Sequence, residues 1–107
     1  MSNIQNNKII QLRHKELAKM LSVIAYPTRM ATLEKVAIEG GCVFGKIIDV
    51  NSLHEQTVSN NLKLLRKHNF IKGKLAPKNL HYCVNFEEID KLKNLFDEYY
   101  LVINQYR

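Results

Sequence analysis

The sequence predicts a mainly α-helical domain with one β-hairpin, whose elements follow the order α-α-α-α-β-β-α. Most of the chain carries apolar residues at the three- and four-residue spacing that is typical of amphipathic helices. Residues 70–84 differ, because two short apolar stretches flank the turn-forming segment 76–79 (APKN). The length of 107 residues and the 46% share of hydrophobic residues suit one packed domain, which we expect to span residues 1–107.

The first predicted helix spans residues 8–25, where apolar residues recur at helical spacing between basic ones. It should end before Pro27, because a residue that precedes proline disfavours the helical conformation. Proline suits the first turn of a helix, so the second helix is expected to begin there and to end at the Gly40-Gly41 pair.

The middle of the chain predicts an extended segment, a brief helix and then a longer helix. Residues 42–44 (CVF) are expected to be extended, and residues 45–50 leave room for one short helix only. Ser52 and Glu55 match a capping box, in which a hydroxyl and a carboxylate bond the free backbone donors of a helix start. The longer helix should therefore span residues 53–69. Its expected buried face consists of Val58, Leu62 and Leu65.

The last predicted helix, residues 87–106, is apolar on more than one face, which is too broad for a stripe that meets one small core. The simplest second partner is another copy of the chain. The first helix is net basic and the last is rich in acid, so the two should pack together. We therefore predict a homodimer through residues 8–25 and 87–106. The expected interface residues are Leu12, Leu17, Ile89, Leu92, Phe96, Tyr99 and Ile103.

The formal net charge of +6 is concentrated in one part of the chain. Residues 56–86 contain no Asp or Glu, and the basic residues outside this window equal the acidic ones in number. The basic residues of the window are Lys63, Arg66, Lys67, Lys72, Lys74 and Lys78. A localised excess of this kind indicates a polyanion partner, most often nucleic acid. The alternative is a solvated basic surface without a partner.

A short helix, a turn, a longer helix and a basic hairpin together describe a winged helix-turn-helix. The face of the longer helix opposite its leucines is mostly amide and hydroxyl, which can contact base edges in the major groove of DNA. The predicted base readers are Gln56, Ser59 and Asn60. Lys63 is expected to reach guanine or phosphate, and Thr57 to contact phosphate or to cap the helix locally. Phosphate or minor-groove contacts are expected from Lys72, Lys74 and Lys78 of the hairpin. Arg66 and Lys67 lie towards the helix C-terminus. For these two residues, complementing the helix dipole is an equal alternative to contacting DNA.

These residues resemble the ArsR–SmtB family of dimeric winged-helix repressors. Residues 25–36 (AYPTRMATLEKV) are similar to the family segment A-D-P-T-R-L-x-I-L, and residues 56–66 (QTVSNNLKLLR) to its recognition helix S-T-V-S-x-H-L-K-x-L-R. The segments NFIKGK and HYCV match its wing strands. The resemblance implies a homodimeric repressor. Tyr26 stands where the family has Asp, the turn glycine is missing, and residues 42–57 are one residue longer.

The metal ligands of that family are not recognisable, so no metal and no cofactor are predicted. The segment 42–44 stands where one family site has C-V-C-D, and the last helix has no His to accompany its carboxylates. The histidines at 14, 54, 68 and 81 are scattered and are expected to lie at the surface or at helix caps. Cys42 and Cys83 are either small buried hydrophobes or a redox pair, because this segment can pair with the wing in such folds.

The predicted function is sequence-specific binding of double-stranded DNA by a transcription regulator, a homodimeric repressor on an inverted repeat. The chain shows no glycine-rich phosphate loop, no supported carboxylate pair and no Cys–His nucleophile arrangement, so an enzyme is not expected.

No apolar run approaches the roughly 20 residues of a membrane span, and MSNIQNNKII does not look like a signal peptide, which favours a cytoplasmic protein. The rival is a winged-helix protein-interaction module without specific DNA binding. The effector stays open between a small molecule, a partner protein and a redox signal.

Overall fold

The computed structural model describes residues 9–45, 55–76 and 78–107. It is mainly helical, with a small antiparallel sheet of three strands. The elements in chain order are α2 (Leu12–Ile24), α3 (Pro27–Ile38), β1 (Cys42–Phe44), α4 (Glu55–Lys67), β2 (Ile71–Ala76), β3 (Asn79–Val84) and α5 (Phe86–Asn104). Residues 46–50 of the predicted brief helix and Ser52 of the predicted capping box lie outside the described residues.

The first described helix, α2, begins at Leu12, and residue 8, where the sequence predicts its start, lies outside the described residues. Gln11 precedes it, and the backbone N–H of Gln11 donates to Nδ1 of His14 at 2.9 Å. The start was not predictable from hydrophobic spacing, because the apolar pattern continues upstream through Ile9 and Ile10. The helix start is instead marked by the capping box that Gln11 and His14 form. The expectation that His14 serves a helix cap is confirmed.

Helix α3 begins at Pro27 as predicted and ends just before the glycine pair. The N–H of Gly40 bonds the carbonyl of Ala37, and the N–H of Gly41 bonds the carbonyl of Val36, both at 3.1 Å. This pattern is a Schellman motif, which needs a left-handed residue after the helix. Gly40 and Gly41 have φ values of 105° and 90°, so glycine at these positions relieves the strain that a side chain would meet.

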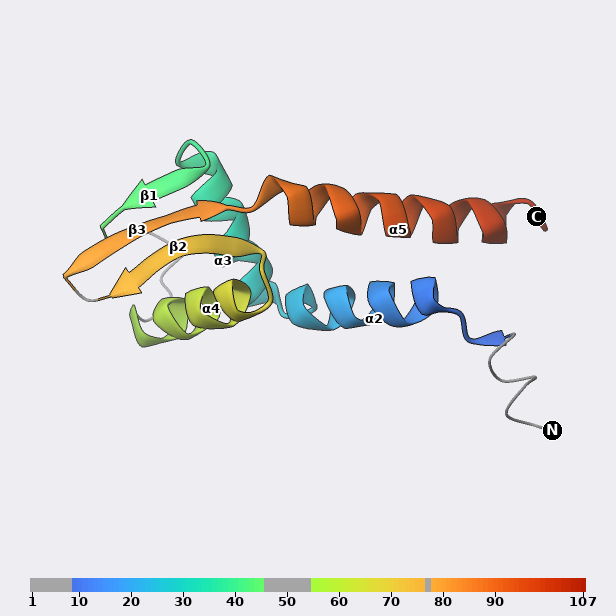
Figure 1. Cartoon of the computed structure of the whole chain (residues 1–107), viewed down its shortest axis with the longest axis horizontal. Coiled ribbons are helices and arrows are strands. Elements are labelled where there is room, and N and C mark those ends of the chain that lie inside the picture. Colours follow the sequence, from blue (N-terminus) through green and yellow to red (C-terminus); the bar gives the residue numbers. More distant parts are fainter. Residues whose placement is uncertain (1–8, 46–54, 77) are drawn as a thin grey trace.

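The sheet has the strand order β1-β3-β2, with β3 in the centre (Figure 1). Strands β2 and β3 form the predicted hairpin, which we call the wing, and Ile71 pairs with Val84 at its base. Phe70 precedes β2 and is buried in the core instead of extending the strand. Strand β1 pairs with the other edge of β3, so residues 42–44 are fixed to the wing.

One hydrophobic core holds the sheet against the helices. The inner face of the sheet contributes Val43, Ile71, Tyr82 and Val84, and α3 contributes Val36. Helix α4 adds Val58, Leu62 and Leu65, as predicted from their spacing. Burying one aliphatic side chain of this size stabilises a fold by about 1.5–3 kcal/mol, so this row of three fixes the rotation of α4 on the core.

Helices α2 and α5 run side by side away from the sheet (Figure 1). Arg13 of α2 lies 4.0 Å from the Glu98 carboxylate of α5, and Glu16 of α2 lies 3.7 Å from Lys91 of α5. The predicted packing of these two helices is confirmed. Only the first ion pair has the polarity that the net charges predict, because the second places the acid on α2. None of the described helices is both long and apolar enough to cross a membrane.

Candidate nucleic-acid interface

Helix α4 presents its polar row to solvent. Gln56, Asn60 and Lys63 are exposed, while Thr57 and Ser59 are half-buried at the edges of the same surface. The opposite face is the leucine row that packs on the core. The structure therefore brings the five α4 residues predicted to contact DNA onto the outward half of one helix, with Gln56 and Asn60 at its centre.

A buried polar contact, which the sequence interpretation missed, also holds α4 in place. The side-chain amide of Asn61 donates to Oγ1 of Thr32 on α3 at 3.2 Å, and the Thr32 hydroxyl donates to the carbonyl of Thr28 at 2.7 Å. Asn61 and Thr32 are 6% and 0% exposed. Helical spacing from Val58 to Asn61 to Leu65 is the signal that identifies Asn61 as an inward residue.

The two outward amides of α4 bond to each other. Nε2 of Gln56 donates to Oδ1 of Asn60 at 3.1 Å, one helical turn further on. This bond does not use the Oε1 acceptor of Gln56 or the Nδ2 donor of Asn60. An adenine edge in the major groove offers one acceptor (N7) and one donor (N6), so the chemistry of this remaining donor and acceptor is complementary to it.

A groove of about 360 Å³ separates the C-terminal half of α4 from the wing. It is lined by Lys63, Arg66, Lys74, Leu75 and Ala76. Nε of Arg66 donates to the carbonyl of Gly73 at 2.7 Å, which ties the helix directly to β2. Arg66 therefore makes a structural contact that the sequence did not predict, whereas its expected role of complementing the helix dipole stays a prediction. Lys63 and Lys74, which are both predicted to contact DNA, line the same groove.

Gly73 lies in β2 at a position that favours glycine. Its φ is 120°, and a Cβ built on it lies only 2.2 Å from the backbone oxygen of His81. A side chain here would be strained by the backbone conformation and would collide with the neighbouring strand.

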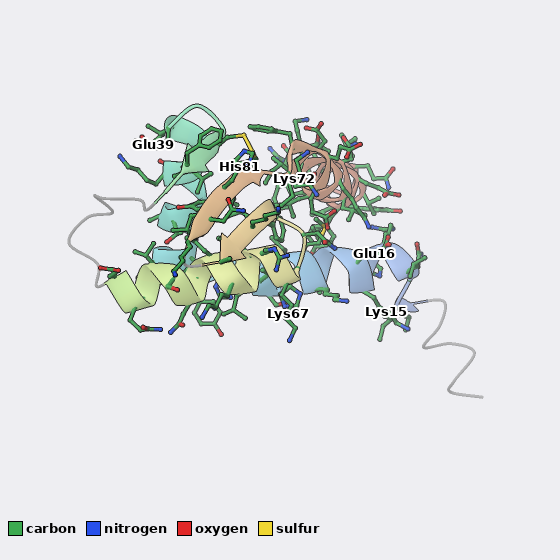
Figure 2. The ribbon with its side chains drawn as sticks, turned by 60° about the vertical axis from the view of Figure 1, so that its left-hand side comes forward. Lys15, Glu16, Glu39, Lys67, Lys72 and His81 are labelled. Carbon is green, nitrogen blue, oxygen red and sulfur yellow. A yellow bond between two sulfur atoms is a disulfide. The ribbon has the colours of Figure 1, made fainter. Side chains whose placement is uncertain are left out.

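The three lysines of the wing lie at different positions along the hairpin. Lys74 pairs with His81 in the strand register and Lys78 lies in the turn, near the end of the molecule that also carries the N-terminus of α4 (Figure 1). Lys72 pairs with Cys83, closer to the base of the wing, and projects from the outer face of the sheet (Figure 2). All three are exposed. Lys72 thus lies farther along the wing from the Gln56–Asn60 pair than Lys74 does.

The predicted dimer residues divide into two groups. Leu17 is only 4% exposed and is buried within the protomer, and Ile89 and Leu92 pack against its core. Leu17 therefore serves the fold of one chain, whereas Ile89 and Leu92 are half-buried and keep part of their surface exposed. Exposed apolar side chains remain along α2 and α5, among them Leu12, Phe96, Tyr99 and Ile103, which are 41–70% exposed.

Cys42 and Cys83 are joined by a disulfide that links β1 to β3. The two residues are directly opposite in the strand register. The expected approach of the two thiols is thus confirmed, whereas their redox role stays a prediction. The sulfur of Cys83 lies 4.0 Å from Nε2 of His81, so this histidine belongs to the same cluster and is not isolated as the sequence suggested.

One of three comparisons with known proteins found a relative. No protein-family model matches the chain, and no solved structure matches it. An uncharacterised HTH-type transcriptional regulator of Methanocaldococcus jannaschii is 28% identical over 87 residues, which cover 80% of this chain and 97% of the relative. The chain is therefore similar over most of its length to a protein named as a helix-turn-helix regulator, and membership of the ArsR–SmtB family stays a prediction.

Proposed function

We propose that this protein is a transcription regulator of the ArsR–SmtB type that binds double-stranded DNA sequence-specifically, as a homodimeric repressor on an inverted repeat. The observation that carries the proposal is the rigid mounting of α4. Its leucine row and Asn61 fix one face to the core, so the face with Gln56 and Asn60 points outward beside a basic groove. The similarity to a helix-turn-helix regulator supports the same class and gives no support to an enzyme.

In this proposal, α4 enters the major groove and the wing follows the backbone. Gln56, Ser59 and Asn60 read base edges, because amides and hydroxyls both donate and accept. The lysines and Thr57 supply phosphate contacts, which give affinity and fix the register without reading sequence. These contacts come from Lys63 and Thr57 of α4 and from Lys72, Lys74 and Lys78 of the wing.

The proposed dimer forms through α2 and α5. No described residue of α5 is buried, although the helix carries Phe96, Tyr99, Tyr100, Leu101 and Ile103. A helix with such an apolar surface gains by packing against an equivalent copy, and closed two-fold symmetry is the commonest solution. Two copies of α4 would then address half-sites about one helical turn apart.

Anisotropy titrations test the proposal directly. Labelled duplexes from the region upstream of the gene are compared with random-sequence duplexes of the same length and base composition at several salt concentrations. We expect clear preference for one sequence and a steep loss of affinity with salt. Equal affinity for all duplexes would contradict sequence-specific regulation, and selection from a random DNA pool would then enrich no motif.

The rival function is a protein-interaction module with a winged-helix fold. A module of that kind needs neither an outward pair of amides nor a cluster of three basic side chains. This chain has both features. Binding to heparin and to bulk genomic DNA at low salt separates the two functions. A chain that binds neither would favour the interaction module.

The disulfide supports a second, regulatory part of the proposal. It fastens β1, which leads to the helix-turn-helix, to the central strand of the wing. A dithiol reductant that opens this bond, and itself closes to a disulfide, would loosen that connection and change the affinity for DNA. Wild-type protein should therefore bind DNA differently after oxidation and after reduction, and a Cys42→Ser, Cys83→Ser variant should not. Equal affinity of oxidised and reduced wild-type protein would remove the redox switch and leave DNA recognition intact.

A further inference from the structure

We propose that Cys42, Cys83 and His81 form a binding site for a soft divalent cation of the Zn²⁺ class when the disulfide is reduced. The sulfur atoms and an imidazole nitrogen of these three residues all lie within 4.8 Å of one another. Figure 2 shows the disulfide and His81 together, on the side of the sheet that faces away from α4. The inference is independent of the proposed function, because it concerns cation binding and not DNA.

The strand register builds this site. Cys42 faces Cys83, and Phe44 faces His81 two residues further along the same strand pair. Side chains of directly paired residues, and of residues two apart, project from the same face of a sheet. The intervening pair, Val43 and Tyr82, is buried on the opposite face and anchors both strands in the core. The backbone positions of the three ligand residues are therefore fixed by the paired strands.

Phe44 orients the imidazole. The Phe44 and His81 rings are stacked, with centroids 4.2 Å apart and an angle of 12° between their planes. In this orientation Nε2 of His81 points to the cysteine pair, 4.0 Å from the Cys83 sulfur. Neighbouring groups that fix the orientation of a ligating histidine strengthen metal sites, and here the stacked Phe44 ring restricts the imidazole.

The disulfide and the metal-bound form of the two cysteines exclude each other. A dithiol supplies two electrons and two protons, so the Cys42–Cys83 bond breaks, two thiols form, and the dithiol closes to its own disulfide. Zn²⁺ then displaces both thiol protons to solvent and forms two Zn–S bonds and one bond to the neutral imidazole. Because the same two sulfur atoms form either the disulfide or the Zn–S bonds, oxidation expels the metal.

The distances suit a tetrahedral ion. Two thiolates at about 2.3 Å from zinc lie roughly 3.8 Å apart in tetrahedral geometry. Breaking the disulfide lets the sulfur atoms separate by side-chain rotation, and the 4.0 Å between sulfur and imidazole nitrogen is already near the spacing required. Two thiolates and one imidazole favour Zn²⁺ over the hard ions Mg²⁺ and Ca²⁺. The fourth position stays open to water.

This site differs from the C-V-C-D site of the ArsR–SmtB family. That family site needs a second thiolate within the segment 42–44, where this chain has Phe44. Strand pairing supplies the second thiolate from Cys83, 41 residues away in sequence. The two thiolates balance the charge of the cation, so the occupied site leaves the net charge of the wing unchanged.

Cation binding by the full chain tests the proposal. Protein reduced with a dithiol is separated from the reductant without oxygen, and Zn²⁺ binding is measured by competition with a chromogenic chelator. Co²⁺ is measured in parallel, because sulfur-to-cobalt charge-transfer absorption reports thiolate ligands. We expect one ion per reduced chain and none per oxidised chain. The oxidised wild-type protein is a folded control of identical sequence.

Variants separate the three ligands. Cys42→Ser and Cys83→Ser should each abolish the charge-transfer spectrum of a two-thiolate site, and His81→Ala should weaken Zn²⁺ binding by at least about tenfold. His68→Ala is the matched control, because His68 lies at the end of α4 and outside the cluster. Reduced wild-type protein that binds Zn²⁺ no tighter than the oxidised form would overturn the site. Unchanged affinity in His81→Ala would overturn the three-ligand set.

Discussion

Asn61 and Asn60 are neighbours in sequence, yet the fold gives them opposite tasks. Asn61 is buried and bonds Thr32 of α3, whereas Asn60 is exposed and bonds Gln56 on the outer face of α4. The rotation of the helix alone decides which of the two amides is buried and which is exposed. The effects of the two substitutions should therefore separate cleanly.

Replacing Asn61 by alanine should lower the free energy of unfolding by about 1–3 kcal/mol, because the substitution removes a buried hydrogen bond and leaves a small cavity. Asn60→Ala is the matched control and should change stability by less than about 0.5 kcal/mol. Urea denaturation followed by circular dichroism measures both. Equal stability of the two variants would mean that the Asn61–Thr32 contact contributes nothing to holding α4.

Gly73 sets a second residue-scale constraint. Gly73→Ala should destabilise the protein by at least about 2 kcal/mol, because it combines a left-handed backbone with a side chain that collides with the His81 carbonyl. Gly40→Ala is the comparison, since Gly40 has a similar φ of 105° but no atom within 4 Å of an added Cβ. The difference between their thermal midpoints isolates the steric contribution. Similar losses in both variants would show that the backbone conformation alone matters.

At the scale of elements, the hydrogen bond from Arg66 to the Gly73 carbonyl links α4 to the wing. Lys63 of α4 and Lys74 of the wing line opposite sides of the groove between the two elements. Under the proposed function, α4 reads bases and the wing contacts the DNA backbone, so substitutions in the two elements should have different effects on DNA binding.

Lys74→Ala should weaken DNA binding to all sequences about equally and reduce the slope of log affinity against log salt by about 1, because one phosphate contact is lost. Asn60→Ala should instead reduce the preference for the selected sequence by about 1–3 kcal/mol and leave the slope unchanged. Anisotropy titrations at four salt concentrations give both quantities.

Lys93→Ala is the charge-matched control for the salt experiment. Lys93 lies on α5, and its hydrogen bond to the Asp97 carboxylate raises the pKa of its ammonium group above the usual value, so it is cationic at neutral pH. It should not alter the salt dependence. A slope change as large as that of Lys74→Ala would indicate a general charge effect and not a contact of the wing.

At the scale of the whole molecule, α2 and α5 extend beyond the core that holds the sheet (Figure 1). Most of their apolar side chains that do not pack on this core are exposed in one chain. A second copy that covers them would fix the distance between two α4 helices.

Phe96→Glu should convert the proposed dimer into a monomer, because it places a charge in an apolar interface, and DNA affinity for an inverted repeat should fall at least tenfold. Ile38→Glu is the control, since Ile38 is 67% exposed on α3 and lies outside both helices. Size-exclusion chromatography with light scattering measures the mass. A monomeric wild-type protein that still binds the inverted repeat tightly would contradict this arrangement.

Local signals explain which parts of the fold were predictable. Pro27 and the Gly40-Gly41 pair marked both ends of α3, and the leucine spacing identified the buried face of α4. Contacts between distant segments were not predictable in the same way. The Asn61–Thr32 bond depends on how α3 crosses α4. Leu17 was assigned to a partner chain because apolar periodicity shows that a side chain is covered and not which chain covers it.

The disulfide has a topological consequence, because it closes a covalent ring from residue 42 to residue 83. The ring contains α4 and the wing, whereas α2, α3 and α5 lie outside it. A closed ring of this size restricts the unfolded chain, which should stabilise the oxidised protein by about 4 kcal/mol in the chain-entropy treatment. A single protease cut within the ring should therefore open the oxidised chain without dividing it. The same cut should release two fragments from the reduced protein, which gel electrophoresis with and without reductant distinguishes.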